Sequence, residues 1–213
     1  MEKNWGVTFR SIILGAVLIP INALWVVHAE IVWYSGEPTT ISLFYNVVFI
    51  LFLLTMGNYL VKQILPHSAL TPPELLTVYV MLCISSAICG HDMIQILAPI
   101  MGHGYWFASP ENRWLEKFGQ YLPNWLIITD REILRGAYEG NATIYDPKIF
   151  MVWLKPCLWW ISFILAIVLV LYFTNCILRR QWTENERLSY PVIQVPLELT
   201  MHTDQLFRNK ILW

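Results

Sequence analysis

Long apolar runs alternate with short polar interruptions along most of the chain. Four runs are long enough to cross a bilayer, over residues 11–34, 41–65, 74–101 and 150–178, since a helical span needs about 20 apolar residues. Residues 105–148 form a mixed-charge loop, and residues 179–210 form a polar, then amphipathic segment. The pattern predicts an all-α, polytopic helical membrane protein with about four transmembrane helices in a single membrane domain, residues 1–213.

The third run is interrupted near residue 90. It becomes polar at Gly90-His91-Asp92 and then returns to apolar sequence up to Met101. Ionisable side chains at membrane depth are costly and tend to face the protein interior. We therefore expect a discontinuous helix whose free backbone groups bind a substrate or a coupling ion. The alternative is that His91 and Asp92 begin a loop.

Composition supports a membrane protein. The 213 residues are 56% hydrophobic and only 14% charged, against about 25% charged in soluble domains. Eleven tryptophans and ten tyrosines are enough for two interfacial aromatic belts. The net charge is −1, and the absence of a basic block argues against a nucleic-acid partner. The four cysteines lie in apolar runs without a CxxC pair and are interpreted as small apolar side chains.

Basic residues of the short connections predict the sidedness. With four spans, the following all fall on one side: Lys3, Arg10, Lys62, Arg179, Arg180 and Arg187. The positive-inside rule makes this side cytoplasmic. We therefore expect a multi-pass protein of the plasma (inner) membrane, with the N-terminus and residues 179–210 in the cytoplasm and the 105–148 loop outside. Pro110 is expected to begin an amphipathic helix within a loop that lies against the headgroups.

Two further hypotheses concern the ends of the chain. The triplet Val27-His28-Ala29 fits a signal-peptide cleavage site, in which case residues 1–29 would be removed as a signal peptide. The alternative is that these residues stay in the protein as part of the first span. The final residues 211–213 fit the start of a further span, so we expect the N-terminal part of a longer protein, a larger transporter-like bundle.

Polar residues of the spans fall at similar depths when about 1.5 Å is counted per residue. Glu30 and Lys155 are expected to extend to the outer interface. His91 with Asp92 is a candidate for proton uptake, and Gln95 lies three residues beyond Asp92. The candidate residues for binding a substrate or ion are Gly90, His91, Asp92, Gln95, His28, Asn22 and Asn46.

Other functions are less well supported by the sequence. His28 and His91 lie at similar depth and are a candidate haem pair, which leaves open a membrane-embedded redox or metal-binding subunit. No GxSxG or HExxH motif is present, which argues against an intramembrane hydrolase. We expect the protein not to be an enzyme and to have no resident cofactor. A non-catalytic membrane assembly subunit is a third class.

Three motifs resemble a known family. They are Leu-Thr-Pro-Pro-Glu-Leu-Leu at 70–76, Ser-Pro-Glu-Asn-Arg-Trp at 109–114, and Arg-Arg-Gln-Trp-Thr-Glu-Asn-Glu-Arg-Leu-Ser-Tyr-Pro at 179–191. They are similar to an uncharacterised bacterial multi-pass membrane protein family that is distantly similar to the oligopeptide transporter family. The resemblance implies a secondary transporter, with a peptide or metal chelate as cargo and proton coupling as an option. The partners would be the lipid bilayer, the solute and a second copy in a homo-oligomer. The Asn-Pro-Gly motif of the better-known relatives is absent, so the resemblance assigns no binding residue.

Overall fold

The computed structural model describes residues 6–34 and 36–203. Regular structure in these ranges is entirely helical, as predicted. Four helical segments are long and apolar enough to cross a membrane: Phe9–Val32, Tyr45–Ile64, Pro72–Trp106 and Pro147–Asn185. They correspond to the four apolar runs. The further span expected to start at 211–213 lies outside the described residues. The sidedness stays a prediction.

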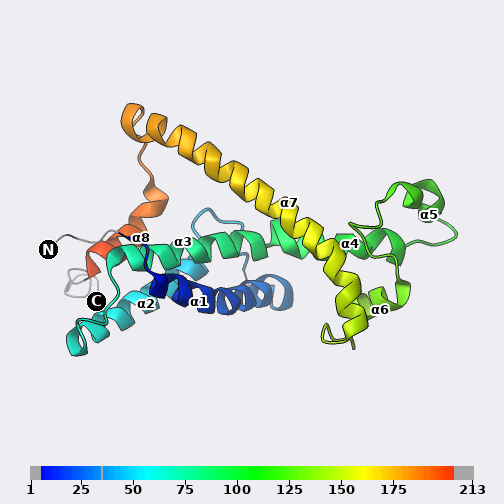
Figure 1. Ribbon diagram of the computed structural model, residues 1–213, viewed down its shortest axis with the longest axis horizontal. Coiled ribbons are helices and arrows are strands. Elements are labelled where there is room, and N and C mark those ends of the chain that lie inside the picture. The colour runs from blue at the N-terminus through cyan, green and yellow to red at the C-terminus, as the bar shows by residue number, and fades with distance from the viewer. Residues whose placement is uncertain (1–5, 35, 204–213) are drawn as a thin grey trace. The chain divides into compact units, whose positions relative to one another are not determined.

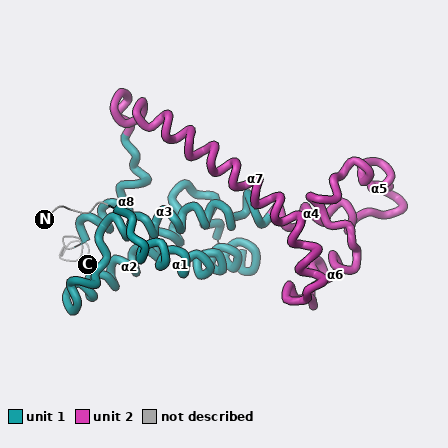
Figure 2. Tube along the Cα trace, in the orientation of Figure 1, with its two compact units in different colours: residues 1–95, 189–213 teal, residues 96–188 magenta. Residues whose placement is uncertain are grey.

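The chain forms two compact units, shown in Figure 2. Unit 1 contains residues 1–95 and 189–213, and unit 2 contains residues 96–188. The single membrane domain expected from the sequence stays a prediction.

Unit 1 is built around the third span. Its helices are α1 (Phe9–Val27), α2 (Tyr45–Ile64), α3 (Pro72–Cys89) and α8 (Pro191–Met201), with two single π-turns, η1 (His28–Val32) and η2 (His91–Gln95). Helix α3 packs most extensively against α1, and also against α2 and α8 (Figure 1). Its core residues Val78 and Leu82 are fully buried against Val47 and Ile50 of α2.

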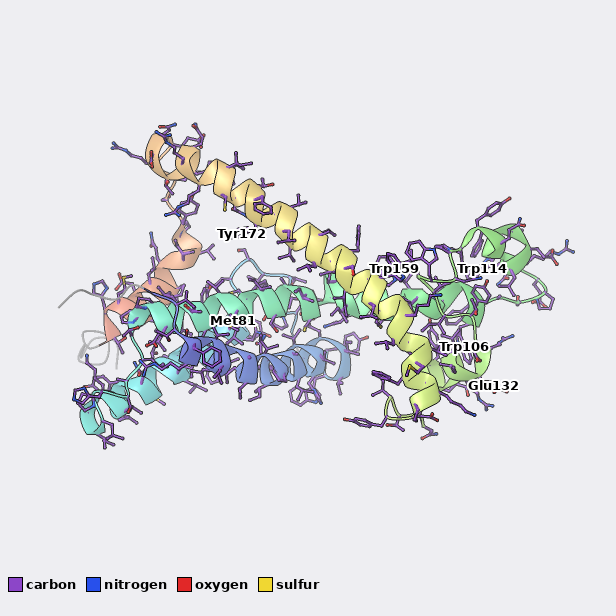
Figure 3. The ribbon with its side chains drawn as sticks, viewed as in Figure 1. Met81, Trp106, Trp114, Glu132, Trp159 and Tyr172 are labelled. Atoms are coloured by element: carbon purple, nitrogen blue, oxygen red, sulfur yellow. The ribbon has the colours of Figure 1, made fainter. Side chains whose placement is uncertain are left out.

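Helices α1 and α3 approach closely at Gly15. A Cβ at this position would lie 2.5 Å from the sulfur of Met81 on α3, a residue labelled in Figure 3. Small residues at such contacts allow membrane helices to approach until their backbones nearly touch. Gly15 therefore leaves room on α1 for the Met81 side chain of α3.

An ion pair joins the first turns of α1 and α3. Glu74 is fully buried and accepts hydrogen bonds from Arg10 Nε at 2.6 Å and Nη2 at 2.7 Å. Glu74 also accepts a 2.7 Å bond from the backbone N–H of Thr71 and completes a capping box there. Helix α3 thus begins with Pro72 and Pro73 in its first positions, behind the capping residue Thr71. Glu74 additionally holds the start of α1, because the Thr8 hydroxyl also donates to it.

Unit 2 contains α4 (Ile96–Trp106), α5 (Trp114–Lys117), the 3₁₀ turn η3 (Gly119–Tyr121), α6 (Arg131–Glu139), α7 (Pro147–Arg180) and the π-turn η4 (Gln181–Asn185). The helix expected from Pro110 is only the four-residue α5, because Arg113 directly before it adopts a left-handed conformation with φ 52°. Helix α6 was not predicted as a separate element. Asp130 caps it by accepting a 2.9 Å bond from the N–H of Glu132.

The 105–148 loop folds back onto α4. Tyr138 of α6 stacks on Trp106, which is labelled in Figure 3, with 5.2 Å between the ring centroids. The Tyr138 hydroxyl donates a 2.5 Å bond to the carbonyl of Pro99, and burial raises the pKa of this phenol. Leu134 is fully buried, and a Cβ on Gly102 would lie 2.2 Å from its Cδ2. The loop is thus an ordered cap on α4.

Candidate polar site at the break in the third span

The third span breaks at Gly90. The backbone of Gly90 is extended, with φ −72° and ψ 175°, and the helix resumes as the π-turn η2. Single π-turns are frequent at functional sites. These torsions are open to any residue, so the requirement for glycine comes from space. A Cβ on Gly90 would lie 2.4 Å from Oγ1 and 2.6 Å from Cβ of Thr39.

Thr39 belongs to the turn between α1 and α2, which we call the 36–44 turn. Its Oγ1 accepts a long 3.4 Å bond from the N–H of His91, the first N–H after the break. The same hydroxyl donates a 2.6 Å bond to Oε1 of Glu30. A backbone donor that a broken helix would present to a ligand is therefore covered by the protein itself.

Glu30 is the centre of these contacts. Its side chain is buried, with the residue 6% exposed, and its Oε1 also accepts a 3.0 Å bond from the N–H of Thr39. Its Oε2 accepts a 2.7 Å bond from Nε2 of Gln95, which also donates a 3.0 Å bond to the carbonyl of Cys89. We call Glu30, Thr39, Gly90 and Gln95 the Glu30 cluster. The expectation that Glu30 extends to the outer interface is wrong, because three donors hold it inside the protein.

A second polar group lies deeper in unit 1. Asn46 Nδ2 donates to Asn22 Oδ1 at 2.8 Å and to Ser86 Oγ at 3.0 Å, and Asn22 Nδ2 donates to Ser86 Oγ at 2.9 Å. All three residues are fully buried. This amide cluster (Asn22, Asn46 and Ser86) joins α1, α2 and α3. The Oδ1 atom of Asn46 is buried and has no hydrogen-bond partner.

The predicted candidates therefore separate into two sets. Asn22, Asn46, Gly90 and Gln95 lie in the two clusters, whereas His28, His91 and Asp92 have exposed side chains. His28 bonds through Nδ1 to the carbonyl of Leu24, four residues earlier, at 2.8 Å. The binding roles of all seven residues stay predictions.

Three residues of the two clusters, Glu30, Thr39 and Ser86, were not among the binding candidates chosen from the sequence. Glu30 carried a signal, because an acidic residue within an apolar run is unusual. Ser86 carried a weak one as half of a Ser-Ser pair in the third run. Thr39 carried none, since a threonine in a turn is ordinary. In the part of the chain that the structure describes, no three His, Cys, Asp or Glu side chains are grouped so that they could hold a metal ion.

Comparison with known proteins identifies a family but no function. A family of unknown function, DUF6785, matches residues 1–213. No curated protein and no solved structure matches the chain. The comparisons therefore do not show the distant similarity to oligopeptide transporters that the three motifs implied. They do show that the chain belongs to the DUF6785 family of unknown function.

Proposed function

We propose that this protein carries a small solute across the plasma membrane, as a secondary transporter or part of one. The observation that supports the proposal is the Glu30 cluster, in which a buried carboxylate lies beside a break in a membrane-length helix. Discontinuous helices form the substrate and ion sites of many transporters. A purely structural bundle has no need of this arrangement, because an acidic side chain in a span costs about 2.5–3.5 kcal/mol even on insertion scales.

The exposed residues at the break are candidates for contact with the solute. His91 and Asp92 follow Gly90 directly and both have exposed side chains, so a solute can reach them without displacing a buried partner. The cargo that the three sequence motifs imply, through their distant similarity to the oligopeptide transporter family, is a peptide or a metal chelate. The proposal keeps the predicted sidedness, with the N-terminus in the cytoplasm and the break near the outer surface.

Uptake by proteoliposomes tests the proposal. The purified full-length protein would be reconstituted and offered labelled dipeptides, tripeptides and iron chelates, with and without an imposed pH gradient. We expect at least one of these solutes to accumulate above the level in protein-free liposomes.

Two variants connect such uptake to the break. We expect His91→Ala and Asp92→Asn each to lower uptake at least tenfold at equal incorporation. Glu116→Gln is the matched control, because Glu116 is exposed on the short helix α5, and its uptake should equal the wild type. No accumulation of any solute in the panel, or full uptake by both break variants, would contradict the proposal.

A further inference from the structure

We infer that Glu30 is a proton-binding site, and that its protonation releases the contacts that hold the π-turn η2 at the break. The use of this proton in transport rests on the proposed function, whereas the protonation itself does not. His91 and Asp92 were the sequence-based candidates for proton uptake, and the contacts in unit 1 favour Glu30 instead.

The surroundings of Glu30 suit a group that gains and loses a proton. Its three hydrogen bonds all come from neutral donors, two on Thr39 and one on Gln95. Glu30 has no ion pair among residues 6–34 and 36–203. A buried carboxylate without a paired charge retains a large desolvation cost, which binding a proton removes. Glu74 shows the contrast, because Arg10 neutralises it directly.

The other titratable groups on the elements around Glu30 do not take over this role. They are His28 on its own π-turn, Glu37 on the 36–44 turn, Cys89 at the end of α3, and His91 and Asp92 on η2. None of these side chains is hydrogen bonded to Glu30. His28, Glu37, His91 and Asp92 are exposed.

The hydrogen-bond geometry shows what a proton would change. A proton on Oε2 would form an O–H that points at Gln95 Nε2, which is itself a donor. The Gln95 amide can offer its oxygen instead only by turning over, and this breaks the bond from Nε2 to the Cys89 carbonyl. The Oε1 atom of Gln95 is buried and has no partner at present. It is the acceptor that becomes available when the amide turns.

Protonation of the other oxygen has a similar effect on the 36–44 turn. Oε1 accepts two bonds from Thr39, one from its N–H and one from its hydroxyl. A proton on Oε1 would require the hydroxyl to reverse and accept. In either case Glu30 loses its charge and one O–H bond forms. Protonation of Oε2 costs η2 the bond from Gln95 to the Cys89 carbonyl on α3, whereas protonation of Oε1 reverses the Thr39 hydroxyl that links Glu30 to the 36–44 turn. The proton is taken from water.

The position of Glu30 indicates the side from which the proton arrives. Glu30 is 21 residues beyond Phe9, the first residue of α1, which corresponds to about 32 Å of helix rise. The hydrocarbon core is about 30 Å thick. With the N-terminus in the cytoplasm, the carboxylate lies near the outer boundary, so the proton would come from the outer aqueous phase.

Infrared difference spectroscopy on the purified full-length protein tests the inference without any solute. Spectra would be recorded at a series of decreasing pH values. We expect an acid carbonyl band to appear on acidification in the wild type and to be missing in Glu30→Gln. The matched control, Asp92→Asn, removes an exposed carboxyl on the neighbouring turn and should keep this band.

A second variant retains the carboxyl and changes only a donor. Thr39→Val removes the hydroxyl that stabilises the Glu30 carboxylate, so a larger share of the acid band should be present at the same pH. An unchanged band in folded Glu30→Gln, or a band that follows Na⁺ at constant pH, would overturn the inference. If Glu30→Gln does not fold, an unaltered band in Thr39→Val would overturn it.

The two proposals fail separately. A protein that shows the Glu30 band but accumulates no solute refutes the transport function and leaves the proton site in place. Solute uptake without a Glu30 band refutes the proton site and leaves transport in place.

Discussion

Substitution of Gly90 by alanine tests how firmly the 36–44 turn is fixed at the break. The added Cβ would lie 2.4, 2.6 and 2.8 Å from Oγ1, Cβ and Cγ2 of Thr39. These three atoms of Thr39 are its Cβ and the two atoms bonded to it, so rotation of the side chain cannot take all of them out of the way. The backbone of the 36–44 turn must therefore move. Overpacking of this kind costs about 1–3 kcal/mol. Movement of Thr39 also weakens two hydrogen bonds to Glu30, and a lost bond to a charged group costs about 1.5–3 kcal/mol.

A destabilisation of about 3 kcal/mol corresponds to a fall in melting temperature of about 6–12 °C for a chain of this size. Thermal unfolding in mild detergent, followed by tryptophan fluorescence, would measure this fall. Gly57→Ala is the matched control, because a Cβ at Gly57 in α2 meets nothing within 4 Å and alanine favours a helix over glycine. Equal melting temperatures for the two variants would refute the reasoning, since they would mean that Thr39 is free to move away from the break.

Three further substitutions test contacts elsewhere, the first two by the same melting experiment and the third by limited proteolysis. Arg10→Gln leaves the buried carboxylate of Glu74 without its ion pair and should cost about 3 kcal/mol; Arg135→Gln, in an exposed pair on α6, should have no measurable effect, and equal losses would contradict this contrast. Asn46→Ala removes the two hydrogen bonds that Asn46 donates to Asn22 and Ser86 and should cost about 1–3 kcal/mol; an unchanged melting temperature would contradict this. Tyr138→Phe should speed proteolysis of the 105–148 loop, because it removes the hydroxyl bond to α4; an unchanged cleavage rate would show that ring stacking is sufficient.

The all-helical class and the four membrane-length helices could be predicted because they follow from local sequence. An apolar run of more than 20 residues has few alternatives to a spanning helix. The polar residues Asn22, Asn46 and Gln95 could be singled out for a similar reason. Each of them interrupts an apolar run, and a polar side chain in such a run must find a partner.

The pairing of these polar residues could not be predicted. Asn22 and Ser86 are 64 residues apart in the sequence, and they meet only because α1 and α3 pack against each other. Depth along a span gives the level of a side chain but not the side of the helix from which it projects. For this reason the estimate from helix rise per residue placed His28 and Glu30 at the same depth, although His28 is exposed and Glu30 is buried.

The length of α7 has a consequence for the lipid that this protein can tolerate. Its 34 residues rise about 51 Å, well beyond a hydrocarbon core of about 30 Å. Its side chains are largely exposed and apolar, and Pro156 is the only buried residue of this fully described helix. A helix with such excess length must tilt, bend or thicken the surrounding bilayer. We expect its tilt to decrease as the acyl chains become longer. The hydrophobic thickness of the bilayer would then set the orientation of this helix.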